Sequence, residues 1–254
     1  MKQLLRFEFR KLFRSKAFYV CVAISIAFIL LTVLIVKAME VELKKVDPNY
    51  DTVYTSLSLI KGVFSNGQIS ILGGIMISIL VCEDFTSDTL KNVYARGYSR
   101  QSVFGAKLIV SLVAYMIMFF AGVLLSLISG AVLFDGFGTA GANYVGAFIA
   151  TILLVLAYFS IFFTISYLSR KLSLAITFCI IAPLGVSLLL SLGDVLVAKL
   201  GDFKLTDYWI DGRLTQMSQY DVSGGNIIGA VIISLVVIAG MTLLISLVNR
   251  KRDA

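Results

Sequence analysis

The stretch at residues 17–36, AFYVCVAISIAFILLTVLIV, contains no Asp, Glu, Lys or Arg. An α-helix rises about 1.5 Å per residue, so a run of this length crosses the roughly 30 Å of hydrocarbon in a bilayer. The residues that follow it, Val36-Lys37-Ala38-Met39, make a poor signal-peptide cleavage site. The stretch therefore predicts a transmembrane helix that remains in the protein as an anchor.

The composition of the whole chain indicates the same class. Of its 254 residues, 59% are hydrophobic and 15% are charged, and the mean hydropathy is +0.94, which is too apolar for one soluble domain. Five more stretches are long enough to span a bilayer; they are residues 63–82, 108–134, 144–168, 172–192 and 227–248. We predict an all-α integral membrane protein with six transmembrane helices in a single domain, residues 1–254. The outer end of the second span is interrupted by Asn66, Gly67 and Gln68, so its start is open.

Lys and Arg residues are distributed unevenly around these spans. With the N-terminus inside, 15 of the 22 flank the inner ends of the spans, and cytoplasmic flanks are enriched in these residues. We therefore expect both termini in the cytoplasm. The net charge of +7 then reflects topology and contact with anionic lipid, not binding of nucleic acid.

Residues 1–16 have the pattern of an amphipathic helix. Leu5, Phe9, Leu12 and Phe13 share one face, and three arginines form a stripe beside it at spacings of four. Such a helix lies on the membrane surface, and the residues predicted to contact it are Leu5, Arg6, Phe9, Arg10, Phe13 and Arg14. The alternative is a positively charged flank that only sets topology.

Two features mark the second half of the chain. Pro183 lies inside the fifth span and predicts a kink near the middle of the membrane. Residues 193–225 mix apolar and charged side chains and predict short amphipathic helices on the outer surface, with Tyr208 and Trp209 at the level of the lipid headgroups.

Several kinds of chemistry are disfavoured by the residue content. The chain has no histidine, which excludes His-ligated zinc or haem and a Ser/His/Asp triad; no catalytic residue and no metal site is predicted. Cys21, Cys82 and Cys179 lie in or beside different spans and are interpreted as packing residues. Two carboxylate pairs, Glu83 with Asp84 and Glu40 with Glu42, are interpreted as solvated surface.

Energy coupling within the chain is also disfavoured. None of the six apolar stretches contains an acidic or basic residue, whereas ion-coupled transporters usually hold such groups in the membrane. The nearest approach to a phosphate-binding loop, from Gly97 to Lys107, has the wrong spacing and no hydroxyl. The chain is therefore not predicted to be an enzyme or to bind a cofactor. Uphill transport would need energy from another subunit.

A polar loop, residues 83–107, separates the second and third apolar stretches. Within it, residues 87–97, SDTLKNVYARG, predict a short helix with an acid near its start, bases toward its end and Gly97 after it. Ser99 can cap the next helix. The pattern favours a folded docking element at the inner face, where a soluble motor could push. The alternative is a structured but passive loop.

The sequence CEDFTSDTLKN at residues 82–92, followed by RGYSR at 96–100 and by Lys107, resembles a family signature. It is similar to the permease subunit of type-2 ATP-binding cassette exporters of the bacteriocin-immunity, bacitracin-resistance and cytolytic-peptide type. The layout of nearly the whole chain is similar too, although Asp88 stands where many relatives have glycine.

The resemblance implies a coupling helix at residues 86–96 that seats in a groove of the ATPase, with Glu83 at its hinge. The ATPase-coupling residues that it implies are Glu83, Thr86, Asp88, Leu90, Lys91, Tyr94, Arg96, Gly97 and Arg100.

By the same resemblance, the chain exports an amphipathic peptide, peptide antibiotic or lipid-like molecule across the cytoplasmic membrane of a bacterium. Two ATPase subunits carrying ATP and Mg, and a second copy of this permease or a related one, complete the complex. A substrate cavity is expected on the dimer-facing sides of the spans, lined by Ser70, Ser78, Tyr115, Phe119, Ser160, Phe163 and Thr164. Two other classes stay open: a non-transporting anchor, immunity or sensor partner that binds a peptide, and a membrane enzyme that acts on lipid.

Overall fold

A computed structural model describes residues 2–46, 56–65, 67–86, 93, 95, 97–134, 141, 143–197, 204–219 and 221–253. All regular elements within these ranges are helical, which agrees with the predicted class. Five helices are long and apolar enough to cross a membrane. They are α2 (Lys16–Val46), α6 (Arg100–Leu133), α7 (Tyr144–Ser169), α8 (Leu172–Val197) and α10 (Gly224–Asp253).

The predicted second span is divided into two helices. α3 covers Ser56–Ser65 and α4 covers Gln68–Thr86. Between them Gly67 has a φ of 64°, a left-handed conformation that glycine adopts without a steric penalty. The predicted limits of 63–82 are therefore wrong, and the break falls where polar residues interrupt the apolar pattern. α4 is not among the five candidate spans, so a sixth span stays a prediction.

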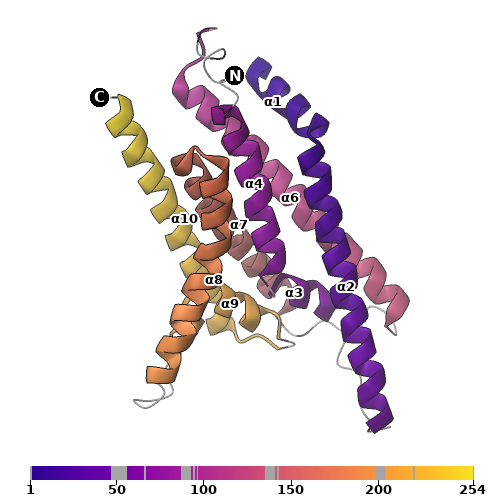
Figure 1. Cartoon of the computed structure of the whole chain (residues 1–254). Helices are drawn as coiled ribbons and strands as arrows, with labels where there is room; N and C mark the ends of the chain where they lie inside the picture. The colour runs from indigo at the N-terminus through magenta and orange to yellow at the C-terminus, as the bar shows by residue number, and fades with distance from the viewer. Residues whose placement is uncertain are drawn as a thin grey trace.

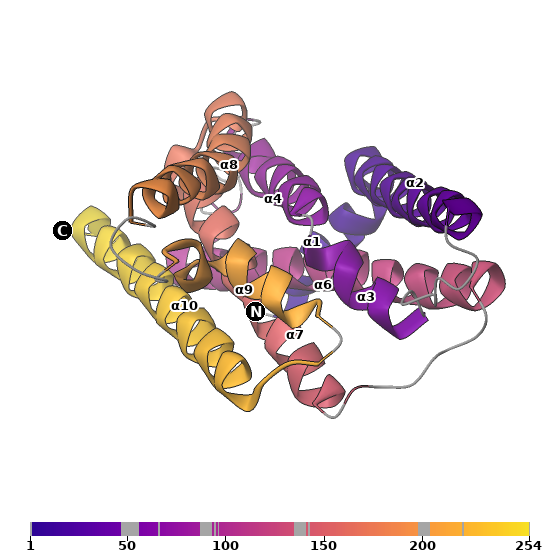
Figure 2. The same ribbon diagram turned by 90° about the horizontal axis from the view of Figure 1, so that it is seen from below.

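The long helices run between two ends of the bundle, and Figure 1 shows both termini at the same end. The last turn of α4 and the first turn of α6 also lie there, beside α1 (Lys2–Arg14). The opposite end carries α3 and α9 (Ile210–Met217) (Figures 1 and 2). The loop predicted to dock a motor therefore leaves and re-enters the bundle at the end that carries the termini.

The interior of the bundle is built around α7 and α4. In the 18-residue apolar stretch that marks each candidate span, 61% of α7 is buried inside the bundle, compared with 17% of α8 and 11% of α10. α10 and α8 pack against α7, and α8 also packs against α4, while α2 packs against α6. The outward surfaces of α2, α8 and α10 are apolar and exposed, as expected for helices that face lipid.

Glycines allow the close approach of α4 to its neighbours. A Cβ on Gly73 would lie 2.1 Å from the ring of Tyr115 in α6, and one on Gly74 would lie 3.1 Å from the ring of Phe162 in α7. Small residues at such contacts let helices pack tightly inside a membrane. The aromatic side chains of the bundle therefore lie directly against the backbone of α4.

The described part of residues 193–225 contains the short helices that the sequence predicts. A 3₁₀ turn, η1 (Thr206–Tyr208), precedes α9, whose buried side chains are Ile210, Leu214 and Met217. That spacing places one apolar face of α9 against the bundle. α8 continues without interruption through Pro183 to Val197.

The N-terminal helix packs on the bundle with one side. Its buried residues are Leu4, Glu8 and Leu12, and α1 contacts α6. Leu5 and Phe9 are half-buried, whereas Phe13 is 49% exposed. The arginine stripe of Arg6, Arg10 and Arg14 is exposed. Of the predicted apolar face, Leu12 therefore packs inside the bundle together with Glu8, which lies near the charges of Lys107 and Lys11, and contact of the other residues with the membrane surface stays a prediction.

Candidate functional site

A buried group of charges lies at the base of the polar loop. Asp84, two residues before the end of α4, is 2% exposed. Its two carboxylate oxygens accept hydrogen bonds from Lys11 of α1 and Lys107 of α6. One carboxylate thus joins three helices that are far apart in the sequence. We call Glu8, Lys11, Glu83, Asp84 and Lys107 the ionic cluster.

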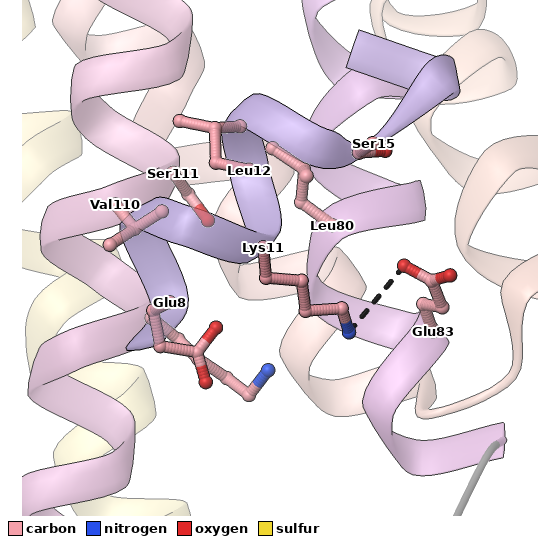
Figure 3. Close-up of a pocket in the computed structure, with 9 residues that line it drawn as sticks. Glu8, Lys11, Leu12, Ser15, Leu80, Glu83, Val110 and Ser111 are labelled. Carbon is pink, nitrogen blue, oxygen red and sulfur yellow. Dashed lines mark ion pairs between the residues drawn. The ribbon is translucent and has the colours of Figure 1, made fainter. Parts of the chain in front are cut away.

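The two remaining acids of the cluster occupy different environments. Glu83 lies on the solvent side, with its side chain 51% exposed and its Oε2 3.5 Å from Lys11 Nζ. Glu8 is only 8% exposed and extends from α1 toward α6 (Figure 3). Lys11 is therefore shared between Asp84 and Glu83, and Glu8 lies on the buried side of the same group.

Burial changes the proton affinities of the cluster residues on α1. Desolvation raises the pKa of Glu8 above its ordinary value, against the opposing charge of Lys107. Desolvation alone would lower the pKa of Lys11, but its hydrogen bond and charge interaction with Asp84 outweigh that effect and raise it. Lys11 therefore stays charged, while Glu8 takes up a proton more readily than an exposed glutamate does.

A small cavity of about 20 Å³ opens beside these charges, between α1, α4 and α6. Figure 3 shows Lys11 reaching across it toward Glu83, with Leu12 and Val110 on the apolar side. A space of this size holds about one water molecule. The cluster is thus tightly enclosed, and a shift of any one of the three helices changes its ion pairs.

An aromatic group lies next to the ionic cluster and extends the connection to α7. Phe85 of α4 meets Tyr167 of α7 edge to face at a centroid distance of 6.1 Å, and Phe104 of α6 meets the same tyrosine at 5.0 Å. Arg170, in the turn after α7, stands 5.7 Å from the Phe85 ring. The end of α4 is therefore held by charges on one side and aromatic rings on the other.

The returning part of the loop packs on α1 and α6. Val93 and Tyr98 contact a small apolar cluster of Leu4, Val103 and Ala106. The hydroxyl of Tyr98 donates to Gln3 Oε1 at 3.4 Å. Motion of the loop would therefore reach α1 through apolar contacts as well as through ion pairs.

The predicted cap of the third span is confirmed. Ser99 has extended backbone angles, and its hydroxyl accepts a hydrogen bond from Ser102 N at the start of α6. Gly97 has a φ of 83°, as expected for a glycine that ends a helical segment. Val93 and Ala95 are helical, in line with the predicted short helix.

The predicted ATPase-coupling residues fall into two groups. Glu83 and Thr86 lie in the last turn of α4, Gly97 lies in the turn and Arg100 begins α6. The others lie outside the described residues; they are Asp88, Leu90, Lys91, Tyr94 and Arg96. The described residues of the loop thus define its two ends and place them beside the ionic cluster.

The interpretation of the carboxylate pairs as solvated surface was wrong for one member of each. Asp84 is buried beside exposed Glu83, and Glu40 is 1% exposed beside exposed Glu42. Glu40 is paired with Lys37 at 3.1 Å and with Lys44 at 2.9 Å. Adjacent or alternate residues of a helix point in different directions, so the two members of a pair meet different surroundings.

The residues predicted to line a substrate cavity are all in the interior of one chain. Their exposed fractions run from 0% for Ser78 to 9% for Ser160; the others are Ser70, Tyr115, Phe119, Phe163 and Thr164. The Ser78 hydroxyl, for example, lies 3.0 Å from that of Ser166 and donates to Gly74 O. These side chains pack helices together, so a cavity at these positions finds no support. All three cysteines are also buried, as predicted for packing residues.

Sequence reasoning missed most of the ionic cluster. It placed Glu83 at the hinge of the loop, whereas the buried carboxylate is Asp84. Two signals were present: Glu8 and Lys11 are one helical turn apart on the predicted N-terminal helix, and Lys107 begins the apolar part of the third span. Among the described residues, no group of three or more His, Cys, Asp and Glu could hold a metal ion.

Comparison with known proteins identifies one family. The model of the family described as ABC-2 family transporter protein matches residues 4–185. The matched region includes α1, the ionic cluster, the polar loop and the helices from α2 to α7. No curated protein and no solved structure matches the chain.

Proposed function

Because the chain belongs to the ABC-2 transporter family, we propose that it is the permease subunit of an ATP-driven exporter. Members of this family are the membrane components of transporters and associate with ABC ATPase subunits. The chain is a multi-pass membrane protein. In the proposed complex, ATP and Mg are bound by two ATPase subunits, and this chain pairs with a second copy or a related permease.

The ionic cluster is the observation that supports a mechanism for this exporter. An ATPase that docks on residues 87–96 pushes on the last turn of α4, where Asp84 is bonded to α1 and α6. Phe85 passes the same displacement to α6 and α7 through Tyr167. ATP binding thereby shifts four helices together and changes which side of the membrane the complex opens to.

The proposed orientation places the end with both termini in the cytoplasm of a bacterium. It rests on the excess of Lys and Arg at that end and on the position of both termini there (Figure 1). This arrangement requires an even number of crossings. In the proposal α4 is the sixth crossing; it is shorter than the other five, but it begins beside α3 at the opposite end and ends at the end that carries the termini (Figure 1).

The proposed substrate is an amphipathic peptide, a peptide antibiotic or a lipid-like molecule. The membrane-spanning surfaces of the chain are apolar with scattered hydroxyl groups, which suits a molecule that partitions into the bilayer better than a sugar or an ion. An alternative role as a non-transporting immunity or sensor partner would use the same surfaces without ATP-driven movement.

Two variants separate docking from force transmission. Leu90→Asp with Tyr94→Asp places charges in the proposed contact helix, and we expect it to abolish co-purification with the cognate ATPase. Asp84→Asn leaves that helix intact but breaks the buried ion pairs. We expect it to keep the ATPase bound and to lower ATP-dependent export in vesicles by at least about tenfold, a barrier change of about 1.4 kcal/mol.

Ser223→Asp is the matched control, since Ser223 is exposed at the opposite end and aspartate can replace it as the cap of α10. Unchanged ATPase binding in the Leu90/Tyr94 variant would refute docking on the loop. ATPase binding without any ATP-dependent export by the unaltered chain would favour the non-transporting role.

A further inference from the structure

The end of the bundle opposite the termini contains a cavity with a volume of about 520 Å³. It lies between α8 and the start of α10 and is closed by η1 and α9. Figure 2 shows these elements from that end, with η1 between α8 and α10. The volume is within the range of about 300 to 1,000 Å³ that is typical of small-ligand sites.

A carboxylate without a basic partner forms part of its wall. The Asp211 carboxylate accepts hydrogen bonds from the hydroxyls of Tyr158 in α7 and Ser187 in α8. Among the described residues no Lys or Arg lies within 4 Å of it. This contrasts with the ionic cluster, where two lysines neutralise Asp84. Two hydroxyls position the Asp211 carboxylate but do not balance its charge.

The nearby basic residues are engaged elsewhere, with one exception. Lys61 is buried, donates to Gln219 O at 2.7 Å and stands 5.1 Å from the Tyr144 ring. Arg213 donates to Gln216 Oε1 and faces the Tyr208 ring. Lys204 also lines the cavity and is exposed; it has no ion pair within 4 Å in the described part of the chain, although its charge also acts on Asp194. The cavity thus offers negative charge at Asp211 and positive charge at Lys204.

Further lining groups suit a cation with N–H donors. Asp207 adds a second carboxylate, and Gln216 and Asn226 add amide oxygens. The indole of Trp209 also lines the cavity, and a cation can bind over an aromatic ring. These groups would satisfy the three donors of a primary ammonium.

The surroundings of the cavity are those of a lipid. The adjacent faces of α8 and α10 expose large apolar side chains, with Leu188 64% and Ile228 63% exposed. Tyr208 and Trp209 mark the level at which aromatic residues gather between the hydrocarbon and the water. A molecule with a charged head in the cavity could therefore lay its apolar part along either helix.

We propose that the cavity between α8 and α10 binds the headgroup of a phospholipid that carries a primary ammonium, of the ethanolamine class. The ammonium pairs with Asp211 and Asp207, the phosphate lies toward Lys204, and the acyl chains follow α8 and α10. A basic peptide would satisfy the carboxylates but brings no anion to Lys204, whose nearby carboxylate at Asp194 is already hydrogen-bonded to Leu205 and Thr206; the presence of both charges in the cavity therefore favours the zwitterionic headgroup. The site requires only a membrane-embedded chain and does not rest on export.

The test uses the full chain purified in detergent, with bound lipid counted by native mass spectrometry. We expect phosphatidylethanolamine to bind at least about tenfold more tightly than phosphatidylglycerol, because only its headgroup carries the ammonium that pairs with the two carboxylates. Soluble phosphoethanolamine should compete with the lipid. Equal binding of the two lipids, or no competition by phosphoethanolamine, would overturn the proposal.

Single substitutions test which residue contacts which part of the headgroup. Asp211→Asn and Asp207→Asn should each reduce the preference for ethanolamine, whereas Lys204→Gln should weaken both lipids alike. Asp207 and Lys204 are not bonded to the helix bundle, so their variants keep the test valid if Asp211→Asn fails to fold. Asp221→Asn, exposed and outside the cavity, is the control. The proposed lipid site would be contradicted if both aspartate variants kept the lipid preference unchanged. It would also be contradicted if a basic amphipathic peptide bound and phosphatidylethanolamine could not displace it.

Discussion

Asp84 is the residue on which the end of α4 most depends. Its carboxylate and the ammonium of Lys107 are each 3% exposed as side chains, and Lys11 adds a second pair. Buried ion pairs often add little net stability, but removing one partner leaves an uncompensated charge. The residue therefore matters less for the energy it contributes than for the arrangement it enforces.

We expect Asp84→Asn to lower the free energy of unfolding by about 3–5 kcal/mol, because it leaves Lys107 buried and without its counter-charge. The measurement is the melting temperature of the detergent-purified chain. Glu42→Gln is the control, because the ion pair of Glu42 with Lys45 is exposed at the surface and contributes little to stability. Exchanging the charges, Asp84→Lys with Lys107→Asp, should recover part of the loss, and a purely additive double variant would show that the pair is not coupled.

The burial of Glu8 predicts that the stability of the folded chain depends on pH. Burial raises the pKa of Glu8 above 4.5, so the folded chain holds this proton more tightly than the unfolded chain. The contribution to stability is fully present below pH 4.5 and is lost as the pH rises through the higher pKa of the folded state.

Glu8→Gln should remove that dependence. We expect the variant to gain melting temperature relative to the unaltered chain as the pH rises above 4.5, and to keep a constant difference once the folded Glu8 is ionised. The measurement is a series of melting curves between pH 4 and pH 8. A difference between the two proteins that does not vary with pH would contradict the predicted shift.

At the scale of the elements, the break between α3 and α4 depends on Gly67. Its left-handed φ of 64° turns the chain so that α3 contacts α6 while α4 enters the bundle. Gly62, within α3, has a helical environment in which an added Cβ would meet nothing within 4 Å. The two glycines therefore differ in conformation and not in available space.

We expect Gly67→Ala to lower the free energy of unfolding by roughly 1–2 kcal/mol, because a residue with a Cβ is strained in the left-handed conformation. Gly62→Ala should instead stabilise the chain by about 0.5–1 kcal/mol, because alanine loses less conformational freedom in a helix. Both are measured as shifts in melting temperature. Shifts of the same sign would show that the break is not set by the backbone of Gly67.

At the scale of the whole molecule, the number of crossings decides which loops can meet an ATPase. Lys2, Gln101 and Lys171 are exposed at the end with the termini, while Lys204 and Ser223 are exposed at the opposite end. The native cysteines are all buried, so a cysteine introduced at any of these positions would be the one that reacts first.

Single cysteine substitutions at these five positions test the proposed topology. In intact cells stripped of their wall, a membrane-impermeant maleimide should label Lys204→Cys and Ser223→Cys. It should label Lys2→Cys, Gln101→Cys and Lys171→Cys only after the membrane is opened. Labelling of Gln101→Cys from the side opposite to Lys2→Cys would mean that α4 does not cross, because only α2 and α4 separate these two positions among the helices that could span.

Several features could be predicted from local sequence. They include the membrane class, the positions of α2, α6, α7, α8 and α10 to within about ten residues at each end, the short helices after α8, and the Ser99 cap. Each depends on residues close together in the chain. An apolar stretch must form a helix in lipid whatever its neighbours are, because its backbone groups have no other hydrogen-bond partners there.

The choice of buried charges depended on the packing of distant helices. Asp84 meets Lys11 across 73 residues and Lys107 across 23, and Asp211 meets Tyr158 across 53. Charge pattern alone treated Glu83 and Asp84 as equivalent, since it contains no information on which helix faces which. Burying a charged side chain costs free energy unless a partner compensates its lost hydration. Glu40 finds its partners within α2, but the partners of Asp84 come from α1 and α6 and are known only once the helices are placed together.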